Sequence, residues 1–140
     1  MTFGSAEEYL DFWRPHPALR DAWNDYIEAY LCYDLVGTEP QLRSGVREEA
    51  VLADSESDLR DGVVERAVLA LRRPAVFLRA PRGLADADPL FSDQTIARWE
   101  REVPVLVIRT VPDVNRFTIT FTEKGAKAIA GAMEGLRGQR

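Results

Sequence analysis

Residues 74–108 read PAVFLRAPRGLADADPLFSDQTIARWEREVPVLVI, and this stretch decides the fold class. Short continuous apolar runs stand near its two ends, at residues 75–78 and 105–108, and such runs are typical of strands buried on both faces. Between them, Ser92 or Asp93 can cap a helix that continues through Glu102. A strand, a helix and a second strand in this order predict one βαβ unit with parallel strands and a right-handed crossover.

A further helix is predicted after the second strand, over residues 122–136. Its apolar residues recur at helical spacing, so one face should pack inward. The residues expected on that inward face are Ala126, Ile129, Ala130 and Met133. Residues 74–140 are therefore expected to form a β-α-β-α portion, and the chain is assigned to the α/β class.

Residues 1–73 are predicted to be a helical, cap-like region. Ser5 and Glu8 have the spacing of a capping box, which opens a helix that ends at about Arg14. A second helix is expected from Ala18, because apolar residues recur there three and four positions apart. These residues are Trp23, Tyr26, Ile27, Tyr30 and Leu31.

The segment at residues 37–57 is polar and is interpreted as irregular, apart from a short helical turn at residues 47–52. A third helix follows, with an apolar face that runs from Leu59 to Leu71. Basic residues stand in its last turn, where the helix dipole favours them.

The composition excludes several classes of protein. Apolar residues make up 46% of the 140 residues, charged residues 29%, and the net charge of −5 argues against non-specific binding to nucleic acid. No apolar run approaches the roughly 18 residues that span a bilayer, and residues 1–5 do not resemble a signal peptide. A cytoplasmic location is the default expectation. Cys32 is the only cysteine, which excludes an internal disulfide, and no motif predicts a metal, nucleotide or flavin cofactor.

Two parallel strands are too few for an independent domain. Parallel sheets usually have several strands and are covered on both faces, and unpaired strand edges promote association. The sequence therefore predicts a missing partner. This partner is more chain upstream, a second subunit, or a second copy that completes the sheet.

Several segments resemble the C-terminal half of bacterial α/β-hydrolases. Residues 74–84, PAVFLRAPRGL, are similar to the next-to-last strand and following loop of that family, and residues 105–115, VLVIRTVPDVN, to the last strand and the turn beyond it. The family typically continues as Asn-His-Tyr/Phe-Thr-Ile, whereas residues 115–119 read Asn-Arg-Phe-Thr-Ile. The segments at residues 15–19 and 28–35 are similar to the cap that family members insert before their final strands.

The resemblance implies a serine hydrolase with the chain order nucleophile, acid, histidine. Its Gly-x-Ser-x-Gly nucleophile elbow does not occur in this sequence, so the elbow and the oxyanion hole are expected on polypeptide upstream. The acid is expected on the loop after the first strand, where Asp86 and Asp88 are candidates. Asp86 is favoured by its spacing from Gly83. The alternative is that both are loop aspartates that make turn hydrogen bonds.

Arg116 occupies the position of the family's histidine. Imidazole releases its proton near neutral pH, but guanidinium stays protonated, so Arg116 cannot serve as a general base. It is expected either to pair with the aspartate loop or to be a solvated loop arginine. The lone histidine, His16, is interpreted as a capping or packing residue, and Cys32 as a buried packing residue.

Three functions remain open from the sequence. The first is a truncated or degenerate hydrolase that is inactive alone. The second is a split enzyme, which another polypeptide completes and which then acts on an ester-like or other small apolar substrate. The third is a non-catalytic interaction module or subunit that completes its sheet with a partner chain or by self-association.

Overall fold

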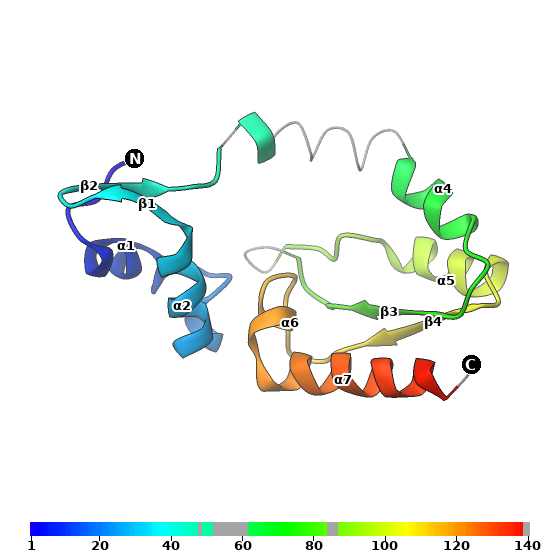
Figure 1. Ribbon diagram of the computed structural model, residues 1–140. Coiled ribbons are helices and arrows are strands. Elements are labelled where there is room, and N and C mark those ends of the chain that lie inside the picture. Colours follow the sequence, from blue (N-terminus) through cyan, green and yellow to red (C-terminus); the bar gives the residue numbers. More distant parts are fainter. Residues whose placement is uncertain (48, 52–61, 84–86, 139–140) are drawn as a thin grey trace. The chain divides into compact units, whose positions relative to one another are not determined.

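The chain folds as two units, Met1–Asp61 and Gly62–Arg140. They are seen in a computed structural model that describes residues 1–47, 49–51, 62–83 and 87–138 (Figure 1). Among these residues, no helix combines the length and the apolar character needed to cross a membrane.

The first unit consists of short helices and a hairpin. Its elements are α1 (Ala6–Trp13), the 3-10 helix η1 (Arg20–Ala22), α2 (Asp25–Asp34), β1 (Leu35–Thr38) and β2 (Gln41–Ser44). The antiparallel pair β1–β2 is extended by Phe3, whose backbone exchanges hydrogen bonds with Leu42 at 2.8 and 2.9 Å. Phe3 also packs edge-on against Tyr9, with 4.9 Å between the ring centroids. An aromatic core therefore ties α1 to the hairpin.

The predicted capping box of α1 is present. The Ser5 hydroxyl accepts a hydrogen bond from the Glu8 amide at 3.2 Å. The Glu8 carboxylate in turn accepts from the amide of Gly4 at 2.6 Å, one residue earlier than the standard motif places it.

Two expectations for the first unit were wrong. The second helix does not start at Ala18: a turn and η1 come first, and α2 begins only after Asn24, whose side chain accepts from the amides of Tyr26 and Ile27. The segment after α2 is a hairpin rather than irregular. Gly37, within β1, makes the close pairing with β2 possible: its φ is 105°, and a Cβ atom there would lie 2.5 Å from the Gln41 carbonyl oxygen. Within residues 47–52, residues 49–51 are helical.

The second unit has the predicted α/β character. Its elements are α4 (Val63–Leu69), β3 (Ala75–Arg79), α5 (Asp93–Glu102), β4 (Leu106–Thr110), α6 (Thr118–Phe121) and α7 (Glu123–Arg137). Strands β3 and β4 pair in parallel, with Ala75 opposite Leu106 and Arg79 opposite Thr110. Helix α4, which the sequence placed with the cap-like region 1–73, belongs to this unit. Leu59, at the start of that predicted helix, lies outside the described residues.

One face of the β3–β4 sheet is closed by α5. Alternation along the strands turns Ala75 and Phe77 toward a core cluster built on Trp99. Trp99 is 1% exposed, and its ring lies 5.8 Å from Phe77 and 4.8 Å from Phe91. The rest of the cluster is formed by Ile96, Val103 and Leu106.

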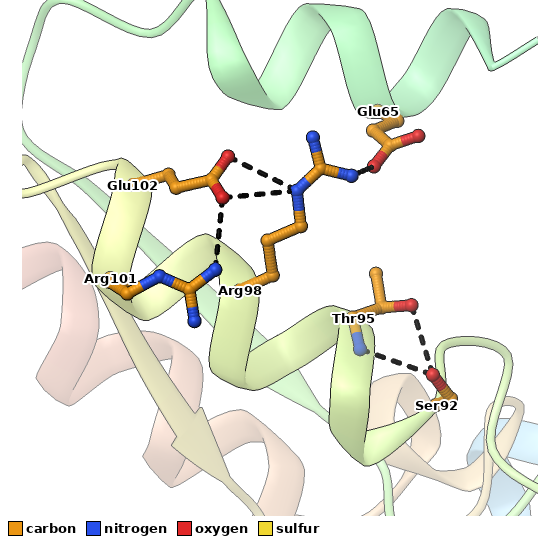
Figure 2. A network of polar contacts seen from close by, with 6 residues as sticks. All are labelled: Glu65, Ser92, Thr95, Arg98, Arg101 and Glu102. Atoms are coloured by element: carbon orange, nitrogen blue, oxygen red, sulfur yellow. Dashed lines mark hydrogen bonds and ion pairs between the residues drawn. The ribbon is translucent and has the colours of Figure 1, made fainter.

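Surface ion pairs join α4 to α5 above this core. Figure 2 shows Arg98 between Glu65 of α4, at 2.5 Å, and Glu102 of its own helix, at 3.1 Å. The hydroxyl of Ser92 caps α5 by accepting from the amide of Thr95, as predicted. These ion pairs add little stability, because all three side chains are exposed to solvent.

The expected orientation of α7 was wrong. Its buried residues are Gly125 and Ala132, whereas Ile129 and Met133 are 37% and 54% exposed. Ala126 and Ala130 are exposed as well. The reason is the contact with α6: a Cβ atom on Gly125 would lie 1.8 Å from the carbonyl oxygen of Ile119. Only glycine permits this approach, and it turns the small side of the helix inward.

Candidate functional site

The candidate site lies where β3 and β4 both end, because the carboxyl ends of parallel strands meet at one edge. The amide of Val111 donates to the carbonyl of Arg79 at 2.9 Å, so the segments that follow β3 and β4 leave the sheet side by side. The two segments are still adjacent a few residues later, where Arg82 and Asn115 form a parallel bridge. The amide of Arg116 donates to the Arg82 carbonyl at 3.1 Å. Arg116 is thus held beside the start of the loop that follows β3.

Asn115 shapes the turn that presents Arg116. Its side chain is buried, and its Oδ1 accepts from the amides of Phe117 and Thr118, both at 2.9 Å. The Asn115 amide donates to the hydroxyl of Thr118 at 2.8 Å. These bonds form a reciprocal Asn–Thr turn that leads into α6. Sequence analysis quoted both residues in the segment 115–119 but gave neither a role, although the Asn-x-x-Thr spacing is a signal for such a turn.

The aspartate loop is only partly described. Asp86 lies outside the described residues, and Asp88 is exposed. The loop turns back on itself at Gly83, whose amide donates to the Ala87 carbonyl at 2.8 Å. A Cβ atom on Gly83 would lie 2.2 Å from the Asp88 carbonyl oxygen, so only glycine fits here. No ion pair joins Asp88 to Arg116 among the residues described.

A cavity of about 150 Å³ lies at this edge of the sheet. Three arginines line it: Arg79, Arg82 and Arg116. The remaining wall is mainly apolar and is formed by Phe77, Leu78, Ala80, Pro89, Leu90, Phe91 and Ile119. Arg116 is exposed at the mouth of the cavity.

Arg79 is the most enclosed of the three arginines. Its side chain is 14% exposed, and its Nη2 donates to the Phe91 carbonyl at 3.1 Å and to Asp93 at 2.7 Å. The Nε of Arg79 is buried without an acceptor among the described residues. Asp93 is 90% exposed, so water screens its charge more than that of Arg79. Sequence analysis missed Arg79, because a charged residue at a strand end gave no sign of facing a cavity.

The turn before Asn115 carries a further ion pair. Asp113 has a φ of 59° and accepts from the Lys124 ammonium at 2.6 Å. The hydrogen bond from Lys124 holds the pKa of the Asp113 carboxyl below its ordinary value. The Asp113 carbonyl accepts from Arg82 at 3.4 Å, which links the turn to the loop after β3.

The arrangement offers positive charge, and the described residues that line the cavity include no histidine, cysteine or serine. A guanidinium is not a general base, so Arg116 does not offer a group that takes a proton from a nucleophile. Among the described residues, no three His, Cys, Asp or Glu side chains converge as they would around a metal ion.

His16 and Cys32 lie in the first unit. The Nδ1 of His16 accepts from the Ala18 amide at 3.2 Å, and its ring is 5.2 Å from that of Trp13. It therefore caps the turn before η1 and packs there, as the sequence indicates. The expectation that Cys32 is buried was wrong: Cys32 is exposed, because α2 directs Ile27 and Leu31 into the core instead.

Comparisons of the chain with protein-family models, with curated proteins and with solved structures found no match.

Proposed function

We propose that the chain is the C-terminal portion of an α/β-hydrolase-family protein and that it is catalytically inactive by itself. The proposal is supported by the order of elements in the second unit: a strand, an acidic loop, a helix, a parallel strand, a short turn and closing helices. It is also supported by the residues at 115–119, Asn-Arg-Phe-Thr-Ile, which differ from the family's typical motif at the histidine.

The observation that carries the proposal is the bridge between Arg82 and Asn115. A hydrolase of this family needs its acid loop and its histidine turn side by side, so that a carboxylate can orient the imidazole. The bridge places Arg82, at the start of the first loop, beside Asn115 in the second, and this proximity supports the proposal. With arginine in place of histidine, no general base acts there, and the nucleophile would have to come from another polypeptide.

If another polypeptide completes the sheet, the substrate would be ester-like or another small apolar molecule. Apolar residues dominate the cavity wall, which suits such a substrate. Even then, Arg116 would keep the rate orders of magnitude below that of an intact triad.

A second candidate is a non-catalytic interaction module. It is favoured by the exposed apolar residues on α7, Ile129 and Met133, and by Val107 of β4, which is 45% exposed. Such residues can pack against a partner chain or a second copy. The reading frame directly upstream separates the two candidates. A Gly-x-Ser-x-Gly elbow encoded there supports the hydrolase portion, and its absence supports the interaction module.

The assay for catalysis is hydrolysis of p-nitrophenyl acetate and p-nitrophenyl butyrate by the purified chain. We expect the rate to equal that of buffer, both for the native chain and for Arg116→His, because the variant still lacks a nucleophile. Turnover that is abolished by Asp86→Ala or Asp88→Ala would show that the chain holds a working site, and would contradict the proposal.

A further inference from the structure

Helix α7 leaves an apolar face open to solvent, which we call its outer face. The outer face consists of Ala126, Ile129, Ala130 and Met133, and all four residues are exposed. Their spacing places them on one side of the helix, next to the buried stripe that contains Gly125 and Ala132. The outer face thus carries two large and two small apolar side chains, and the large ones are 37% and 54% exposed.

A row of charged residues borders the outer face on the side opposite the buried stripe. The row is Glu123, Lys127, Glu134 and Arg137, all exposed, so the charges run negative, positive, negative, positive, with Ala130 at the middle. The row ends within the described residues, before positions 139–140. Glu123 and Lys127 form an ion pair at 2.6 Å, but their side chains are 81% and 75% exposed, so this pair is weak.

This order of charges is complementary to itself when the helix is reversed. In an antiparallel pair of identical helices, the same edge of each helix meets its copy in the opposite order. With the two-fold axis at Ala130, Glu123 lies opposite Arg137 of the second copy, and Lys127 lies opposite Glu134 of the second copy. A parallel pair would place the charged row of one helix against the other edge of its copy and would form neither ion pair.

The apolar side chains are complementary in size in the same antiparallel register. Met133 lies level with Ala126 of the second copy, and Ile129 lies level with Ala130 of the second copy. A large side chain opposite a small one lets two helices interdigitate closely. Size and charge therefore favour one register, although they depend on different residues of the helix.

We infer that two copies of the chain associate through their α7 helices, antiparallel, with the two-fold axis at Ala130. The inference rests on the second candidate function, the interaction module, and names its partner as a second copy. A single helix pair buries less than the roughly 1,200 Å² of a stable interface, so the dimer is weak, with a Kd on the order of 100 µM. At a few micromolar the chain is a monomer with its outer face exposed.

Sedimentation equilibrium of the full-length chain between about 5 and 500 µM tests the association, because this range brackets the expected Kd. Met133→Lys should weaken the dimer at least about tenfold, since it places an ammonium group against an apolar side chain and near Lys127 of the second copy. Val63→Lys is the matched control: Val63 is 44% exposed on α4 and should leave the Kd unchanged. Circular dichroism checks that both variants are folded.

Two results of this measurement overturn the inference. One is a folded native chain that stays monomeric up to about 500 µM, five times the expected Kd. The other is a dimer that Met133→Lys weakens no more than Val63→Lys does, which would place the contact elsewhere on the chain.

Cysteine cross-linking tests the register, in a Cys32→Ser background because Cys32 is exposed. Ala130→Cys puts two thiols beside the two-fold axis and should give a disulfide-linked dimer on mild oxidation. Ala126→Cys is the control on the same face: its two copies lie about 12 Å apart along the helices, too far for a disulfide. Equal cross-linking of both variants, or none at Ala130→Cys, overturns the inference. Neither measurement follows hydrolysis, so their failure is distinct from that of the hydrolase proposal.

Discussion

The two faces of the β3–β4 sheet are closed to different degrees. On the α5 face, large residues fill the space, and Trp99 is 1% exposed. On the α7 face, the helix approaches through Gly125, Ala128 and Ala132 and leaves Val107 45% exposed. A groove of about 330 Å³ lies between the end of β4 and α7. The α5 face is packed like a finished core, whereas the α7 face keeps apolar surface in contact with solvent.

The difference explains why periodicity predicted one helix better than the other. In α5, the most apolar stripe and the buried stripe are the same, because Ile96 and Trp99 both enter the core. In α7, the more apolar stripe, with Ile129 and Met133, is the exposed one. We interpret this stripe as a surface for additional polypeptide, consistent with a sheet of only two described strands.

The largest expected difference between the two faces is in the free energy of unfolding that is lost when a side chain is truncated. Trp99→Ala should lower the free energy of unfolding of the second unit by about 3–5 kcal/mol, because it leaves a large cavity. Met133→Ala is the control on the other face and should change it by less than about 0.5 kcal/mol, since Met133 is 54% exposed. Urea unfolding followed by circular dichroism measures both. A large loss for Met133→Ala would mean that its stripe is already packed in the isolated chain.

Two glycines of α7 test the orientation of that helix more finely. Gly125→Ala should destabilise by about 1–3 kcal/mol, because its Cβ would collide with the Ile119 carbonyl oxygen. Gly131→Ala should instead stabilise by about 0.5–1 kcal/mol, because nothing lies within 4 Å of its Cβ and alanine favours a helix. The urea midpoint of each variant, compared with that of the native chain, measures the change in its free energy of unfolding. If Gly131→Ala destabilised the chain more than Gly125→Ala, the assignment of the buried stripe would be contradicted.

The smallest expected effect is on the pKa values of two surface carboxyl groups, Glu102 near the α5 face and Asp113 near α7. Hydrogen bonds from Arg98 lower the pKa of Glu102 near the α5 face, as a bond from Lys124 lowers that of Asp113 near α7. A carboxyl whose pKa is lower in the folded state adds stability above its unfolded pKa. That stability is lost as the pH falls through the folded pKa.

Arg98→Gln should therefore raise the pKa of Glu102 and leave that of Asp113 unchanged, and Lys124→Gln should do the opposite. Titration of the side-chain carboxyl carbons by NMR between about pH 2 and 6 follows both groups. A shift of both carboxyls in either single variant would mean that the two sides are electrostatically coupled, contrary to the structure.

Sequence reasoning succeeded where a local signal and the tertiary structure agree. Both parallel strands and the Ser5 capping box were predicted, and Ser92 was one of two residues predicted to cap α5, since apolar runs and cap residues act over a few positions. It failed on α7 and on the hairpin after α2. The first is set by one close contact at Gly125, and the second by the positive φ of Gly37. Neither can be recognised from hydrophobic periodicity.

The candidate site was predictable in part. The proximity of Arg116 to the loop after β3 follows from parallel strands that end at one edge. The role of Asn115 depends on hydrogen bonds across four residues, and that of Arg79 on the shape of the cavity. The expected pairing of Arg116 with Asp88 is not seen, whereas its pairing with Asp86 stays a prediction, because Asp86 lies outside the described residues.

Amide hydrogen exchange of the isolated chain tests the central claim, that the β3–β4 sheet is an unfinished piece of a larger one. The strands alternate, so the amide of Phe77 points toward β4 and those of Val76 and Ile108 point toward the outer edges. In a chain shown to be monomeric by light scattering, we predict slow exchange at Phe77 and fast exchange at Val76 and Ile108. Slow exchange at all three amides in the monomer would mean that both edges are already covered, and would contradict the account.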